Sequence, residues 1–122
     1  MPKKGEIYYV FAKDLDVDGH EQDNDRPYVI VSRDAINVFG TNVVGVPLTT
    51  KLHKANSHRI LIQAAHMIQN SACQRQLRDS VALTDHVRVL DPRRFESPKM
   101  GHMTDTAVGA IELALAFLFD IR

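Results

Sequence analysis

The chain has 122 residues, a formal net charge of zero and an apolar fraction of 44%. This length suits a single domain, residues 1–122, with a core of its own. No apolar run reaches the length of a membrane-spanning helix, and the start of the chain lacks the apolar stretch of a signal peptide. The single cysteine, Cys73, excludes an internal disulfide. Together these features predict a soluble cytoplasmic protein with no membrane partner.

The charge is unevenly distributed along the chain. Residues 14–25 contain six acids and no Lys or Arg, so the rest of the chain has nine acids against fifteen Lys and Arg. A basic body of this kind attracts phosphate groups. A solvated surface with one acidic loop is the simpler explanation of the charge taken alone.

The first half of the chain alternates between predicted strands and loops. Residues 5–11, 27–32 and 42–48 are rich in β-branched and aromatic side chains, which favours strands. The acidic, Gly-containing segment 13–25 is predicted to be a loop, and residues 34–37 a single helical turn.

The second half adds short strands and then one helix. We expect a strand at 58–62 and one or two strands within 80–90, whereas the polar segment 64–78 is ambiguous. Thr104 is a helix N-cap candidate, and apolar residues from Ala107 onward recur at helical spacing. This order predicts a mainly β, α+β domain, a small twisted barrel with a C-terminal helix. The apolar face of this helix is widened by Leu113, Phe117, Phe119 and Ile121. A face this wide indicates either packing against the core or a subunit interface.

The acidic loop partly fits a calcium-binding pattern. Asp14, Asp16 and Asp18 alternate before Gly19, and Asp25 occupies the twelfth position, as in an EF-hand. However, both flanks are predicted strands rather than helices, and the last ligand is shorter than the usual Glu. A solvated loop is therefore favoured, with a calcium-responsive module as an alternative.

Two segments carry groups suited to RNA cleavage without a metal. This reaction uses the sugar 2′-OH as nucleophile and needs a base, an acid and a cation for the charge that develops on phosphorus. His20 and Glu21 are candidate bases, and Arg26 can clamp a phosphate with two hydrogen bonds. Thr49, at a strand end, can donate to a phosphate oxygen. Each motif alone also fits an ordinary surface ion pair or strand end.

Taken in order, these segments resemble the MazF/PemK family of toxin ribonucleases. The resemblance covers nearly the whole chain, and its main segments are Gly5-Glu6-Ile7-Tyr8-Tyr9-Val10, Gly19-His20-Glu21-Gln22, Arg26-Pro27-Tyr28-Val29-Ile30-Val31-Ser32, Val46-Pro47-Leu48-Thr49-Thr50, Asp79-Ser80-Val81-Ala82-Leu83-Thr84-Asp85-His86-Val87-Arg88 and the final helix. It implies an SH3-like barrel of five to seven strands and a C-terminal helix. It also implies the toxin of a type II toxin–antitoxin pair: a homodimeric, cofactor-free, sequence-selective endoribonuclease that cuts single-stranded RNA such as mRNA. Such a toxin inhibits translation and growth and is blocked by its antitoxin.

The resemblance assigns roles to individual residues. Arg26 matches the residue that stabilises the phosphorane or acts as acid, Thr49 matches the one that holds the scissile phosphate, and Glu21 matches the base. Members of the PemK branch also use an Arg two residues before Asp85. This chain has Leu83 there, so roles built on that Arg do not transfer. Other candidates for catalysis or RNA contact are His20, Gln22, Asp85, His86, Arg88, Arg93 and Arg94.

Two alternatives remain open from the sequence. A CcdB-type toxin shares the fold but poisons DNA gyrase without being an enzyme. That group depends on aromatic and apolar residues at its C-terminal end, and this chain has no Trp. A noncatalytic RNA-binding barrel is the second alternative. The histidines show no metal-ligand spacing, so we expect no metal site.

Overall fold

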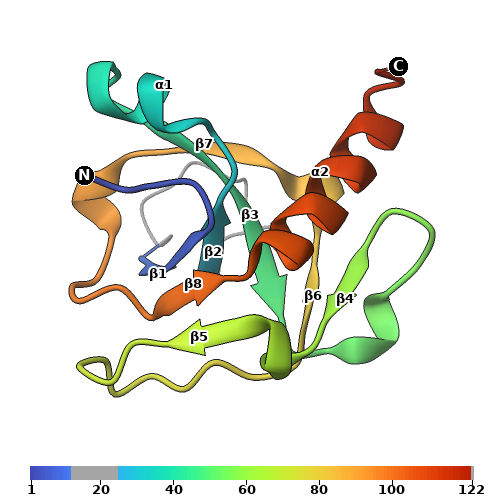
Figure 1. Cartoon of the computed structure of the whole chain (residues 1–122), viewed down its shortest axis with the longest axis horizontal. Helices are drawn as coiled ribbons and strands as arrows, with labels where there is room; N and C mark the ends of the chain where they lie inside the picture. Colours follow the sequence, from blue (N-terminus) through green and yellow to red (C-terminus); the bar gives the residue numbers. More distant parts are fainter. Residues whose placement is uncertain (12–24, 122) are drawn as a thin grey trace.

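The computed structural model describes residues 1–11 and 25–121, which form a strongly curled antiparallel sheet with a C-terminal helix beside it (Figure 1). The strands are β1 (Glu6–Val10), β2 (Arg26–Ile30), β3 (Val43–Thr49), β4 (Ile60–Ile62), β5 (Met67–Gln69), β6 (Ser80–Ala82), β7 (Arg88–Leu90) and β8 (Gly101–Met103), and the helices are α1 (Asp34–Phe39) and α2 (Asp105–Leu118). The predicted fold class is confirmed.

Strand β3 pairs with three other strands of the sheet. The strands run in the order β4-β6-β3-β2-β1-β8-β5, and β7 also pairs with β3. The last residues of β3 pair with β6, whereas its first residues, Val43 to Gly45, pair with β7. Between β6 and β7 the chain makes a 3-10 turn at Thr84–His86. One long strand therefore has three partners, and the sheet curls around it.

Alternating side chains of the central strands fill two apolar clusters, one on each side of the sheet. The first lies under α2, whose Ala107 and Ile111 join it together with Ile7, Val29, Val46 and Leu48. The second contains Val10, Tyr28, Ile30, Val43 and Leu90. Helix α2 begins as predicted, because the Thr104 side chain accepts a hydrogen bond from the Ala107 N–H (3.3 Å).

The described chain has eight strands, one more than the predicted five to seven. Two strands were not predicted: β5, from the segment 64–78 that the sequence left ambiguous, and β8, where the sequence suggested a turn. Strand β5 pairs with β8, more than thirty residues later, through the register Ile68↔His102. Such a distant partner leaves no local signal. Within residues 1–11 and 25–121, neither helix is long and apolar enough to cross a membrane.

The close contact between β5 and β8 depends on Gly101. A methyl group on Gly101 would lie 2.0 Å from the Ile68 carbonyl oxygen, which is backbone and cannot turn away. We therefore expect Gly101→Ala to lower the free energy of unfolding by about 1–3 kcal/mol, measured by urea denaturation. In the matched control Gly109→Ala, the new methyl group in α2 meets nothing within 4 Å. That variant should be more stable than wild type by about 0.5–1 kcal/mol. Equal stability of the two variants would contradict this account.

Candidate active site

The β2–β3 register brings Arg26 and Thr49 to one pocket. Tyr28 pairs with Pro47 and Val29 with Val46, so two further residues along the ladder Arg26 lies level with Thr49. Both residues line an open pocket of about 420 Å³. The full lining is Asp25, Arg26, Pro27, Leu48, Thr49, Thr50 and Ser80. Residues 23 positions apart in the sequence therefore present their side chains to the same space.

The pocket offers hydrogen-bond donors to an anion. Arg26 begins β2 and contributes a guanidinium, the side chain best shaped to hold two phosphate oxygens. Thr49 ends β3, and its hydroxyl oxygen accepts a hydrogen bond from the Lys51 N–H (3.2 Å). Because the hydroxyl is an acceptor in that contact, its own proton can be donated to a group in the pocket.

Arg88 lies on the same side of the sheet as Arg26. Its backbone pairs with Gly45 of β3, and its charge acts on the phenol of buried Tyr28, as does the charge of Arg26. Burial raises the pKa of Tyr28, and the two guanidinium groups oppose that rise. The structure thus brings Arg26, a predicted catalytic residue, and Arg88, a predicted RNA contact, to the neighbourhood of the same tyrosine.

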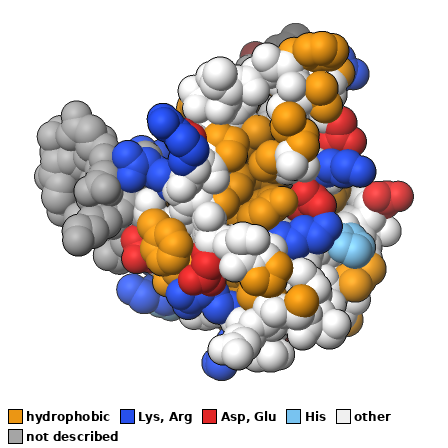
Figure 2. All heavy atoms as spheres, turned by 90° about the vertical axis from the view of Figure 1, so that its left-hand side faces the viewer, with side chains coloured by type: hydrophobic (Ala, Val, Ile, Leu, Met, Phe, Trp, Pro, Cys, Tyr) orange, Lys and Arg blue, Asp and Glu red, His pale blue; other side chains and the backbone are white. Residues whose placement is uncertain are grey.

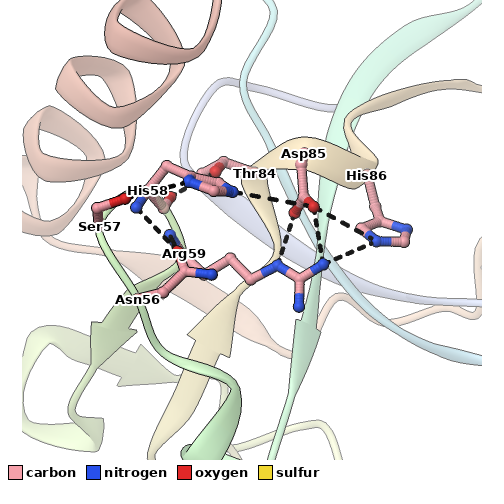
Figure 3. A network of polar contacts seen from close by, with 7 residues as sticks. All are labelled: Asn56, Ser57, His58, Arg59, Thr84, Asp85 and His86. Carbon is pink, nitrogen blue, oxygen red and sulfur yellow. Dashed lines mark hydrogen bonds and ion pairs between the residues drawn. The ribbon is translucent and has the colours of Figure 1, made fainter.

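A second polar cluster surrounds Asp85 (Figure 3). Arg59 holds this carboxylate with two hydrogen bonds, from Nε to Oδ1 (2.8 Å) and from Nη2 to Oδ2 (2.7 Å). Two imidazoles flank the same carboxylate, with the His58 Nε2 3.9 Å and the His86 Nε2 3.8 Å from Oδ2. Arg59 also lies 3.3 Å from the His86 Nε2. All four side chains are partly exposed, so the cluster is open to a ligand.

This cluster borders β3 at residues 45–47, next to the stretch that lines the pocket. The Leu83 N–H donates to the Pro47 carbonyl oxygen (2.9 Å), and Arg88 pairs with Gly45. The turn that carries Asp85 and His86 is therefore fixed alongside the middle of β3, between the partners of Pro47 and Gly45, and it also contacts α2.

Arg59 is a site residue that the sequence analysis missed. Leu83, at the position of the PemK-branch Arg, is buried in the interior, and the guanidinium that meets Asp85 comes instead from the residue before β4. Arg59 and Asp85 are 26 residues apart and meet because Ile60 pairs with Ala82. The hydrogen bonds from Arg59 hold the pKa of Asp85 below its ordinary value, so Asp85 is an ionised acceptor at neutral pH.

Several predicted residues fall outside this geometry. His20, Glu21, Gln22 and most of the candidate calcium loop lie outside the described residues. Arg93 is paired with Asp91 and lines a different pocket, with Thr41 and Asn42. Among residues 1–11 and 25–121, no cluster of three or more His, Cys, Asp or Glu side chains is arranged to hold a metal ion.

The Arg59–Asp85 contact predicts a pH dependence. Because Asp85 has a lowered pKa in the folded chain, its contribution to stability is present above the unfolded-state pKa and is lost as pH falls through the folded-state pKa. We expect Arg59→Met to raise the pKa of Asp85, measured from the carboxyl carbon by NMR titration. The variant should lose at most about 1 kcal/mol of stability at neutral pH and less in acid. The control Arg93→Met should leave Asp85 unchanged, and an unaltered Asp85 titration in Arg59→Met would overturn the assignment.

Comparison with known proteins places this geometry in a family. The family model of PemK-like, MazF-like toxins of type II toxin–antitoxin systems matches residues 3–119. The chain is 27% identical over 113 residues to endoribonuclease EndoA of Bacillus subtilis (strain 168), covering 93% of this chain and 90% of that protein.

Solved structures share the fold. MazF (Form-I) from Deinococcus radiodurans superposes with a TM-score of 0.75 at 21% identity, covering 98% of this chain and 96% of that one. An endoribonuclease in complex with its cognate antitoxin, from a Mycobacterial species, has a TM-score of 0.68 at 23% identity, covering 100% and 98%. With the family model matching almost the entire chain, this protein belongs to the PemK-like, MazF-like toxins of type II toxin–antitoxin systems.

Proposed function

We propose that this toxin is an endoribonuclease that cuts single-stranded RNA at the pocket shared by Arg26 and Thr49. The observation that carries the proposal is this pocket, in which two strand ends supply a guanidinium and a hydroxyl to one open space. The naming of the similar Bacillus subtilis protein as an endoribonuclease supports the same chemistry. The CcdB-type and noncatalytic alternatives explain neither observation as directly.

The pocket suits transesterification within the RNA itself. The ribose 2′-oxygen forms a bond to phosphorus while the bond to the 5′-oxygen breaks, leaving a 2′,3′-cyclic phosphate and a 5′-OH. Arg26 stabilises the negative charge on the non-bridging oxygens, and Thr49 donates to the same phosphate. Glu21 receives the 2′-OH proton, with His20 as the alternative base, and an acid protonates the 5′-oxygen. The side chains and the substrate supply every group, so no metal or cofactor is required.

RNA on either side of the cut would contact the Asp85 cluster. Asp85 is held as an acceptor by Arg59, and His86 and Arg88 lie next to it along β3. Arg88 suits a phosphate, whereas an ionised carboxylate suits the amino groups of a base. Asp85, His86 and Arg88 are thus proposed as RNA contacts beside the cleavage pocket, and Gln22 as another near the base.

The surface around the same pocket is suited to binding an antitoxin. The structure of a Mycobacterial endoribonuclease was solved with its cognate antitoxin. For this chain we propose that the antitoxin covers the pocket of Arg26 and Thr49 through an acidic or apolar segment, which would complement the basic body of the chain. RNA cleavage and antitoxin control both fit the cytoplasmic location that we propose for this protein.

The outer face of α2 supports a homodimer. Only part of this apolar helix faces the core, because Leu113 and Phe117 are 75% and 67% exposed. Phe119 and Ile121 extend the exposed apolar surface to the end of the helix. Exposed apolar surface of this kind is typical of a subunit interface.

Cleavage is tested on a long single-stranded RNA with EDTA present. The wild type is expected to cut it, Arg26→Ala to reduce the rate about 100- to 1,000-fold, and Thr49→Val to reduce it while Thr49→Ser retains most of it. Arg93→Ala removes an arginine that lies outside the pocket and should cut like the wild type. RNA left intact by folded wild-type protein would contradict the proposal. Gyrase-dependent DNA cleavage would then favour the CcdB-type reading, and a calcium requirement would favour a role for residues 14–25.

Dimerisation through α2 is tested by light scattering during size-exclusion chromatography. The wild type is expected to have twice the mass of the chain, and the double variant Leu113→Glu, Phe117→Glu to have the monomer mass, because two charges would face an apolar partner. The control Ile68→Glu changes a 49% exposed residue on β5 and should leave the dimer intact. A wild-type monomer at micromolar concentrations would exclude a stable dimer.

A further inference from the structure

Arg75, on the segment between β5 and β6, forms a flat cationic platform together with the rings of Tyr9 and Phe11. The Arg75 guanidinium carbon lies 3.5 Å from the centre of the Tyr9 ring, and the Phe11 ring meets the same tyrosine edge-on with centres 5.7 Å apart. Arg75 and Phe11 are both about 40% exposed. Tyr9 therefore supports a guanidinium and a second ring that both reach solvent.

Glu96 holds the guanidinium in this position. Its carboxylate accepts hydrogen bonds from Arg75 Nε (2.6 Å) and from Nη2 (3.1 Å). One face of the guanidinium covers Tyr9 and one edge meets Glu96, so the exposed part includes the outer face of the plane. Arg75 and Glu96 also line an open pocket of about 480 Å³, formed by residues 72–75 and 96–98. A flat group thus has both a surface to stack on and space beside it.

The platform adjoins the proposed cleavage pocket. Tyr9 pairs directly with Pro27 across the β1–β2 ladder, and Pro27 lines the pocket of Arg26 and Thr49. The segment that carries Arg75 then leads to Ser80, which lines that pocket as well. Directly paired residues point to the same face of a sheet, so Tyr9 and Pro27 are neighbours on one face, whereas Arg26 follows Tyr28 to the other face. RNA that leaves the pocket over Pro27 would therefore run towards Tyr9 and Arg75.

From this juxtaposition we infer that Arg75, supported by Tyr9 and Glu96 and extended by Phe11, is a stacking site for an RNA base that flanks the cleavage pocket on the Pro27 side. Arginine planes and aromatic rings bind unpaired bases by stacking, with little dependence on base identity. Because Nε and Nη2 of Arg75 already donate to Glu96, the flat face of the guanidinium, rather than this bidentate edge, is available to RNA. The inference rests on the proposed function, because it requires RNA in the pocket. On the face shown in Figure 2, Lys and Arg side chains lie among apolar side chains, a mixture suited to single-stranded RNA.

The test separates contact with a base from contact with a phosphate. The probes are a fluorescent 12-nucleotide 2′-O-methyl oligouridine, in which the nucleophile is blocked, and a 12-unit abasic oligomer with the same phosphates. Arg75→Ala is expected to weaken binding of the oligouridine about ten-fold and binding of the abasic oligomer little. Arg75→Lys keeps the charge and loses the plane, so it should behave like Arg75→Ala. Thermal unfolding shows that each variant is folded.

Two controls distinguish this inference from the proposed function. Arg26→Ala should weaken binding of both probes, since it removes a phosphate contact. Arg93→Ala removes an arginine that is also paired with a carboxylate but has no supporting ring in the described chain, and it should not discriminate between the probes. Equal losses on both probes in Arg75→Ala, or no loss, would overturn the stacking site and leave the cleavage pocket standing. Wild-type protein that binds neither probe would contradict both proposals.

Discussion

The pairing of β2 with β3 is the interaction on which the site depends. Side chains alternate sides along a strand, so a slip of one residue would send Arg26 and Thr49 to opposite faces of the sheet. The slip is prevented by burial on both sides, because Val29 and Val46 enter one apolar cluster while Tyr28 and Ile30 enter the other. The geometry of the proposed cleavage pocket is therefore fixed by the same packing that stabilises the fold.

The long central strand also explains why the site is composite. Because β3 pairs with β2, β6 and β7 at different points, the ends of three chain segments converge beside it. Arg26 comes from β2, Asp85 from the turn after β6, and Arg88 from β7. None of these residues needs a long loop to reach its place, so the sheet itself positions them, and the loops remain available to adjust RNA selection.

Two ion pairs, Arg59–Asp85 and Arg75–Glu96, have the same bidentate geometry. Partly exposed ion pairs contribute little to stability, typically about 1 kcal/mol or less. Their effect is geometric, since two parallel hydrogen bonds fix the plane of a guanidinium or the direction of a carboxylate. In the first pair the oriented group is the carboxylate of Asp85, and in the second it is the flat face of Arg75. Both pairs lie next to the proposed path of the RNA, where orientation matters more than stability.

The sequence by itself determined the fold class, the central strands and the N-cap of α2, because these depend on local periodicity and on motifs in a fixed order. It proposed Arg26 and Thr49 as a pair, whereas the pocket that both residues line depends on strand register. It did not indicate β5 or β8, and it left Leu83 as a gap in the PemK-like pattern. Arg59 and Arg75 can be recognised as site residues only from their contacts with Asp85 and Tyr9, which lie 26 and 66 positions away in the sequence. Only tertiary structure decides such contacts, because the curling of the sheet, rather than any spacing along the chain, brings those side chains together.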